Sequence, residues 1–186
     1  MNIFLDGVPD FIEANGAKHE VNTGFDVWLR VIRRLESLAL PPKSNEDVLM
    51  LVDAFADVAD MVFERVPAVE SMDSTAEILG EIIRFANGPK LLGSTDGDIG
   101  GNFAAFDFWQ DSDAVYASFW QQYGIDLLST PIHFWKFKLL LAGLGDNTPL
   151  ARRIRLRSAG KFDSGNEEMR ENLNKYYKGL NSYGRL

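Results

Sequence analysis

The residues of this chain that could do chemistry are aspartates in a glycine-rich segment, two histidines and a short run of arginines. Asp96 and Asp98 have the spacing of the first ligands of a calcium-binding loop, in which carboxylate oxygens coordinate the ion. The next ligand position holds Gly100, and no glutamate follows where such a loop supplies its bidentate ligand. The same glycines lack the lysine of a phosphate-binding loop, and acids beside them repel phosphate. The segment therefore predicts no metal site and no nucleotide site.

Histidine is the side chain best suited to acid–base catalysis near neutral pH, and the chain contains two, His19 and His133. They are far apart in the sequence. His133 adjoins apolar residues of a predicted helix, where an imidazole usually makes structural hydrogen bonds. Serine-nucleophile motifs and zinc-ligand spacings are absent, and there is no cysteine. We therefore predict that the protein is not an enzyme, and expect no cofactor.

Three aspartates, Asp107, Asp111 and Asp113, resemble a carboxylate cluster. They lie at the start of a predicted helix, where an acidic side chain interacts favourably with the helix dipole and accepts from free N–H groups. We therefore expect these residues to cap the helix rather than to catalyse a reaction or bind a metal.

The charge of the chain is strongly asymmetric. Residues 1–150 contain 23 acidic and 10 basic residues, a net charge of −13, whereas residues 151–186 contain 4 acidic and 9 basic residues, a net charge of +5. We expect an acidic helical body over 1–150, with a mobile glycine-rich loop at 89–105, and a basic helical segment over 151–186. That segment meets either an acidic partner or the acidic body of its own chain, and both alternatives stay open.

Four arginines crowd the start of the basic segment and could neutralise phosphates of a nucleic acid: Arg152, Arg153, Arg155 and Arg157. The charge of −13 on the rest of the chain would repel a duplex, and Ile154 and Leu156 alternate with the arginines as in a solvated helix. Nucleic-acid binding is therefore the less favoured interpretation of this cluster.

Composition places the chain among globular proteins. Its 186 residues are 46% hydrophobic, enough for a sizeable core in one domain, or in one domain with a tail. No apolar run approaches the roughly 20 residues that span a bilayer, and the N-terminal sequence does not have the pattern of a signal peptide. The absence of cysteine suits a reducing cytoplasm.

Hydrophobic spacing predicts a mainly α fold of about six helices after a small N-terminal β-hairpin. Asn15 and Gly16 suit a tight turn within the first 24 residues. Helical spacing begins at Phe25 and continues to Leu38. Further helices are predicted from the capping pair Ser44 and Asp47 to about Arg65, from Asp73 or Ser74 to Asn87, from Thr148 and Pro149 through Arg157, and around Met169 to Leu180.

Residues 111–138 are the most distinctive part of the sequence, because aromatic residues are dense in it. Four rings recur at helical spacing and share one stripe, which must be covered: Tyr116, Phe119, Trp120 and Tyr123. Gly124 ends this helix, and Asp126 lies in the short connection that follows. Pro131 is expected to begin a second helix, which has so few polar residues up to Leu140 that it should be buried.

Two short motifs in this region, Tyr123 to Leu127 and His133 to Phe137, carry a resemblance to a known family. The residues concerned are Asp111, Tyr116, Phe119, Tyr123, Gly124, Ile125, Asp126, Leu127, His133, Trp135, Lys136 and Phe137, with Phe25, Trp28 and Arg157 elsewhere. On these residues the chain resembles the bacteriophage gp-fifteen-type family, which looks like the tail-assembly chaperones of long-tailed phages. The resemblance covers most of the chain. Phe134 stands where the family more often has a second tryptophan.

The resemblance implies a non-enzymatic chaperone that binds the phage tape-measure protein in the host cytoplasm, and keeps it soluble until the tail tube polymerises around it. The tail-tube protein and a second copy of this chain are further candidate partners. The alternative is a structural tail component, such as a completion or connector protein, that stays in the virion.

Some of the abundant aromatic residues are expected to bind the partner, while most form the core. We predict that Trp109, Trp120 and Phe134 form an exposed patch that binds another helix or a second copy. The basic residues Arg152, Arg153, Arg155 and Arg157 are predicted to complete the partner-binding set.

Overall fold

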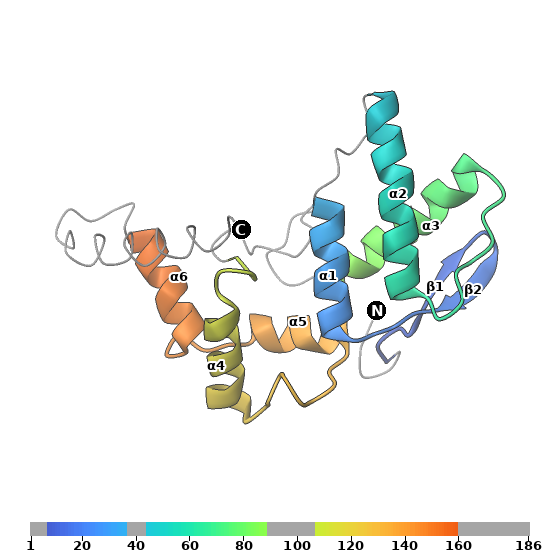
Figure 1. Ribbon diagram of the computed structural model, residues 1–186. Coiled ribbons are helices and arrows are strands. Elements are labelled where there is room, and N and C mark those ends of the chain that lie inside the picture. The colour runs from blue at the N-terminus through green and yellow to red at the C-terminus, as the bar shows by residue number, and fades with distance from the viewer. Residues whose placement is uncertain (1–6, 37–43, 89–106, 160–186) are drawn as a thin grey trace. The chain divides into compact units, whose positions relative to one another are not determined.

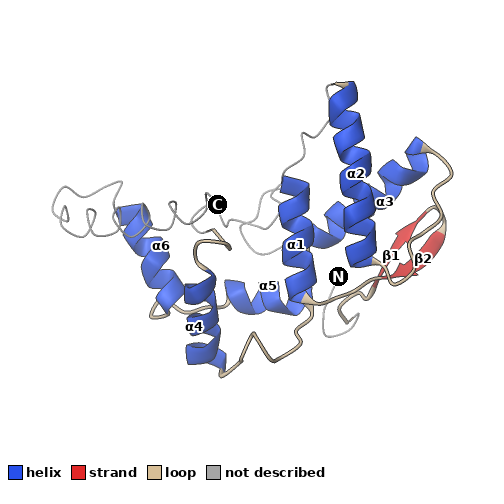
Figure 2. Cartoon of the chain, viewed as in Figure 1, coloured by secondary structure: helices blue, strands red, loops and turns tan. Residues whose placement is uncertain are grey.

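The computed structural model describes residues 7–36, 44–88 and 107–159, without the side chains of Asn45 and of residues 156–159. These ranges contain two strands and six helices (Figure 1, Figure 2): β1 Phe11–Ala14, β2 Ala17–Glu20, α1 Phe25–Glu36, α2 Asn45–Val62, α3 Met72–Asn87, α4 Ser112–Tyr123, α5 Phe134–Ala142 and α6 Pro149–Ala159. The predicted mainly α fold with an N-terminal hairpin is confirmed. The loop predicted at 89–105, with Asp96 and Asp98, and the helix predicted around Met169 lie outside the described residues.

The chain divides into two compact units, and it passes from one to the other between α3 and α4, after Thr130 and after Ala142. The first unit contains β1, β2, α1, α2, α3 and α5, and the second contains α4 and α6. The units thus have different boundaries from the charge division at residue 150. Because α5 belongs to the first unit, the aromatic region 111–138 is shared between the two.

The hairpin forms where the sequence predicts it. Asn15 and Gly16 both have positive φ, 51° and 72°, as a two-residue turn with the twist of the flanking strands requires. The register pairs Ala14 with Ala17 and Ile12 with His19. Ile12 and Ala14 are buried, so the hairpin covers one side of the core with every second residue of β1.

Trp28 of α1 is the centre of the core of the first unit. It is fully buried, its ring stacks on Phe85 of α3 with centroids 4.3 Å apart, and it stacks on Phe134 of α5 at 5.7 Å. Its indole N–H donates to the carbonyl oxygen of Asn22 at 2.6 Å, so burial leaves no unpaired donor on the ring. Three helices therefore converge on one aromatic side chain.

Local capping signals fix the ends of α2 and α3. Ser44 accepts from the N–H of Asp47 at 3.1 Å, and the Asp47 carboxylate accepts from the N–H of Ser44 at 3.0 Å, as the sequence predicts. α2 ends at Val62 rather than near Arg65, because Phe63 is extended. α3 is capped by Ser71 and so begins before the predicted Asp73, and it ends at Asn87, followed by the cap residue Gly88, whose φ is 66°.

α5 begins at Phe134, not at Pro131 as predicted. The residues before it are extended and pair with the segment that precedes α1: the N–H of Phe25 donates to the oxygen of Ile132 at 3.0 Å, and the N–H of Phe134 donates to that of Thr23 at 2.7 Å. This long-range pairing overrides the preference of Pro131 for a first helical position.

In the second unit, α6 packs against α4 through polar contacts. The hydroxyl of Ser118, buried in α4, donates to Ala114 O at 2.6 Å and accepts from the N–H of Leu150 at 3.0 Å. Leu150 is in the first turn of α6, where backbone N–H groups have no partner within the helix. Ser118 of α4 therefore provides a hydrogen-bond acceptor for one backbone N–H at the start of α6.

Candidate functional site

His133 connects the start of α5 to the segment before β1. Its Nε2 lies 2.9 Å from Pro9 O, and its Nδ1 lies 3.0 Å from the backbone N of Trp135. A carbonyl oxygen accepts and an amide N–H donates, so Nε2 carries the proton and the imidazole is neutral. Burial is the main cause that lowers the pKa of His133, and the charge of Lys136 lowers it further, against the opposing effects of Pro9 and Asp10. The geometry assigns the ring a structural role.

Two further side chains of α5 bind the C-terminal end of α3. The indole N–H of Trp135 donates to the carbonyl oxygen of Phe85 at 2.9 Å. The ammonium of Lys138 donates to Ala86 O at 3.3 Å and to Asn87 O at 2.5 Å. These carbonyls belong to the last turn of α3, where the helix supplies few donors and a cation is favoured; Phe85 O also accepts from the N–H of Gly88.

Lys138 is a buried residue that the sequence did not single out. It is 2% exposed, and burial lowers its pKa from 10.5 to about 8. A lysine in the middle of a helix is usually solvated, so the sequence gives only a weak indication that Lys138 is buried. That indication is the small number of polar residues in the predicted helix, which therefore has no polar face on which the lysine could lie.

The rings of α5 lie in the core of the first unit. Phe137 stacks on Phe25 with centroids 4.6 Å apart, and Phe134 is 1% exposed, against Trp28. The prediction that Phe134 is part of an exposed patch is therefore wrong. In a helix that is apolar nearly all round, the sequence does not tell which ring faces solvent, and here the exposed residues are Lys136 and Ala142.

Asp126 organises the turn after α4. Its carboxylate accepts from the N–H of Leu128 at 3.0 Å and from the hydroxyl of Ser129 at 2.8 Å. The Ser129 hydrogen bond is the largest cause that lowers the pKa of Asp126, and a hydrogen bond from Tyr116 contributes. Burial, followed by the Asp126 charge, raises the pKa of Tyr116. The pair thus connects the turn to α4.

The remaining motif residues of the second unit form the end of α4 and its packing. Gly124 is left-handed, with φ 65°, and ends the helix as predicted. Phe119 is fully buried, with the ring of Tyr123 edge-on at 5.6 Å. The N–H of Ile125 donates to Phe119 O at 3.4 Å, and Leu127 is buried.

Asp111 is fully buried and does not cap α4 with its side chain, so that prediction is wrong for this residue. Its carboxylate accepts from the N–H of Asp107 at 3.0 Å and from Arg153 of α6 at 3.3 Å. Arg153 also binds Asp113 with two donors, at 2.7 and 2.8 Å, and this hydrogen bond is the first cause that lowers the pKa of Asp113. Asp107 accepts from the N–H groups of the turn that follows it, at Trp109 and Gln110.

The chain matches the family described as Bacteriophage Gp15 protein over residues 4–181. It belongs to that family. No curated protein and no solved structure matches it. In this Gp15 family member, residues of both motifs make hydrogen bonds within the chain. His133 of one motif binds Pro9 in the first unit, and Asp126 of the other motif binds Tyr116 in the second unit.

The other predicted partner-binding residues of the Gp15 protein lie in the second unit. Trp109 and Trp120 are 46% and 56% exposed, so the predicted exposure of these two rings is confirmed. Arg152 is exposed and donates to Asn147 O at 2.9 Å, and Arg155 donates to Asp146 O. Arg153 binds the two aspartates of α4 described above. The side chain of Arg157 is outside the described residues.

The largest exposed apolar residues of the first unit include three that were not predicted to bind a partner: Leu49, Met50 and Val52 of α2, at 71, 48 and 43% exposure. Helical spacing alone accounts for one apolar face of α2. Residues 48–52 are five consecutive apolar residues, however, and such a run occupies more than one side of a helix. That run was the signal for an exposed apolar surface.

An open hollow of about 490 Å³ lies beside β1 and the second half of α3. Its charged lining residues are Glu13, Glu81 and Arg84, and Arg84 donates to Glu81. Of the predicted site residues, Trp135 lines it. Within the described ranges, no three histidine, aspartate or glutamate side chains gather to hold a metal ion. No helix in this part of the chain is long and apolar enough to cross a membrane.

Proposed function

We propose that this protein is a non-enzymatic tail-assembly chaperone of a bacteriophage, which binds the tape-measure protein in the host cytoplasm and keeps it soluble during tail assembly. The family match supports the phage context. The observation that carries the chaperone function is the exposed apolar surface: each unit has its own set of large, exposed hydrophobic side chains. They are Leu49, Met50 and Val52 in the first unit and Trp109, Trp120 and Leu128 in the second.

Large exposed apolar side chains are suited to covering the apolar stripe of a client helix. Two sets on two units allow a long client to be held at several points by weak contacts, and each contact can be released when the tube forms. The client proposed is the tape-measure protein, with the tail-tube protein and a second copy of the chain as secondary partners.

Co-expression with the neighbouring tape-measure gene tests the proposal. We expect the tape-measure protein to be in the soluble fraction with this chain and in the pellet without it. Equal solubility in both cells would contradict the proposal.

Quantitative mass spectrometry of purified virions separates the chaperone from a structural tail component. A chaperone is abundant in the lysate and absent from the finished particle. A completion or connector protein is retained in the particle at a fixed ratio to the other tail proteins.

A further inference from the structure

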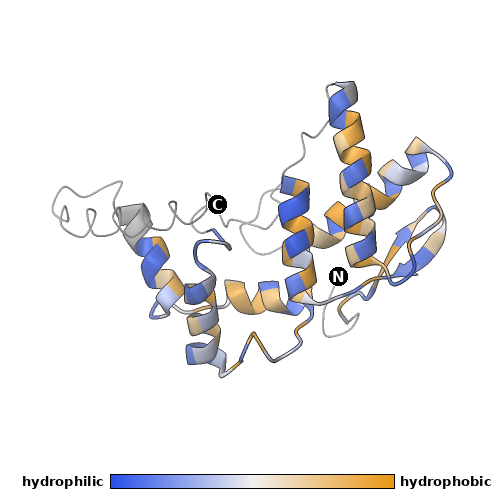
Figure 3. Cartoon of the chain, in the orientation of Figure 1, coloured by the Kyte–Doolittle hydropathy of each residue, from blue (hydrophilic) through white to orange (hydrophobic). Residues whose placement is uncertain are grey.

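The exposed side of α2 carries an apolar row. Leu49, Val52 and Ala56 are exposed and recur at i, i+3 and i+7, a spacing that places them on one side of a helix. Figure 3 shows hydrophobic residues over much of α2. The adjoining side of the same helix is buried, through Ala54, Phe55, Val58, Ala59 and Val62. The apolar row is therefore additional to the face that packs in the core.

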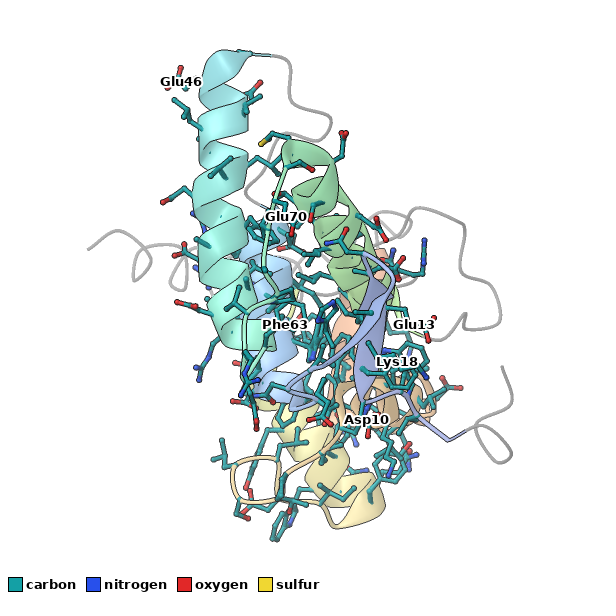
Figure 4. The ribbon with its side chains drawn as sticks, turned by 90° about the vertical axis from the view of Figure 1, so that its right-hand side faces the viewer. Asp10, Glu13, Lys18, Glu46, Phe63 and Glu70 are labelled. Atoms are coloured by element: carbon teal, nitrogen blue, oxygen red, sulfur yellow. The ribbon has the colours of Figure 1, made fainter. Side chains whose placement is uncertain are left out.

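An acidic row lies next to it. α2 contains five acidic residues and no basic residue, a net charge of −5. Four of these are exposed and follow helical spacing, at Glu46, Asp53, Asp57 and Asp60. Figure 4 shows Glu46 at the start of α2 and side chains projecting along the side of the helix that faces away from α3.

One arginine of the neighbouring helix offsets part of this charge. Arg34 of α1 donates to Asp53 at 3.1 Å and to Asp57 at 2.9 Å. The two aspartate side chains remain 79 and 52% exposed, so their oxygens stay accessible to a second cation. Glu46 and Asp60 add two more carboxylates to the row.

We infer that this side of α2 is a docking surface for a basic amphipathic helix of a partner protein, in which leucine-like residues cover Leu49 and Val52 and lysines or arginines face the acidic row. Charge complementarity selects this occupant: a second copy of α2 would bring two acidic rows together. The inference rests on the proposed function, since the client would supply the helix. It adds the location and the chemistry of one contact.

Fluorescence anisotropy with a labelled model peptide tests the inference on the full chain. The probe is a helix of about 20 residues, long enough to form in water, with a leucine stripe flanked by lysines. The comparison peptide has glutamate in place of each lysine. We expect the lysine peptide to bind and the glutamate peptide not to bind at about 0.15 M salt.

Matched variants locate the binding. Leu49→Ser with Val52→Ser should weaken binding of the lysine peptide about tenfold, because the loss of apolar contacts at the centre of an interface lowers affinity. Val66→Ser removes an apolar side chain that is 42% exposed outside α2, and should leave affinity unchanged. Asp53→Asn with Asp60→Asn should weaken binding and reduce its salt dependence. Glu13→Gln with Glu20→Gln, which neutralises two exposed acids of the hairpin, should do neither.

Three results would overturn the inference. The first is that the lysine peptide does not bind, as when residues of this chain cover the surface. The others are equal binding of both peptides, and equal losses of affinity in the test and control variants. These results leave the proposed function standing if the tape-measure protein still needs the chain for solubility. If the peptide pattern holds while the tape-measure protein is equally soluble without the chain, the surface is real and the proposed function is wrong.

Discussion

His133 donates a hydrogen bond to the carbonyl oxygen of Pro9, a residue 124 positions earlier in the sequence. Because the same imidazole accepts from the N–H of Trp135, one neutral ring joins the first described segment of the chain to the start of α5. Protonation would remove the acceptor and place a positive charge at a helix N-terminus, where the dipole disfavours it.

The first prediction concerns the pH dependence that this ring produces. The pKa of His133 is lowered in the folded protein, so the unfolded chain takes up a proton first as the pH falls below about 6.5. Stability is therefore full above that pH and is lost as the pH falls towards the folded pKa. In urea unfolding at pH 7.5 and 5.5, His133→Asn should lose less stability than the wild type on acidification, because asparagine can cap the helix without titrating.

His19→Asn is the control for this experiment. It removes the other histidine, so a pH dependence that is present in His19→Asn and reduced in His133→Asn is due to His133. Equal pH dependence in the wild type and in His133→Asn would contradict the assignment.

The second prediction concerns Lys138, whose effect on stability falls in the alkaline pH range, whereas that of His133 falls in the acidic range. Burial lowers its pKa to about 8, so between about pH 8 and pH 10.5 the unfolded chain holds a proton that the folded chain has released. The contribution of this group to stability therefore rises with pH. The free energy of unfolding of the wild type minus that of Lys138→Met should increase by roughly 2 kcal/mol from pH 7.5 to pH 10. A constant or decreasing difference in chemical denaturation would show that the ammonium is not desolvated.

The third prediction concerns the ion pair of the second unit. Arg153→Met leaves the fully buried Asp111 carboxylate without its arginine, and such a loss costs about 3 kcal/mol. Hydrogen exchange of the Leu150 and Ser118 amides should accelerate strongly, because α6 is joined to α4 there. Arg152→Met, which alters an exposed residue that donates to Asn147, should leave the exchange rates near those of the wild type.

The fourth prediction separates core rings from surface rings. Phe134→Ala removes a ring that is 1% exposed and should destabilise the protein by about 3–5 kcal/mol. Trp120→Ala removes a ring that is 56% exposed and should change stability by less than about 0.5 kcal/mol. Thermal unfolding measures both. Similar losses for the two variants would place Trp120 in a core, and exclude it from the partner-binding surface.

Local signals in the sequence were sufficient for the hairpin turn at Asn15 and Gly16, for the capping pair Ser44 and Asp47, and for the end of α4 at Gly124. Each depends on the backbone preference or short-range hydrogen bonds of neighbouring residues. The mainly α fold was predicted from the helical spacing of hydrophobic residues, and this prediction is confirmed.

Tertiary contacts decided the rest. The start of α5 depends on pairing with residues near Phe25, which lie far away in the sequence, and spacing carries no information about such a partner. Phe134 was assigned to the surface because its helix is apolar on every side, and burial then depends on which side meets Trp28. The sequence groups Arg153 with its neighbours, whereas the fold places it against the buried Asp111, and Arg152 and Arg155 donate to backbone oxygens instead.

The central claim is tested most directly by diluting urea-unfolded tape-measure protein into buffer and following light scattering. With an equimolar amount of this chain, we expect scattering to be suppressed, and we expect Leu49→Ser with Val52→Ser to suppress it less than Val66→Ser does. Scattering as strong as with the same mass of an unrelated acidic protein would contradict the account.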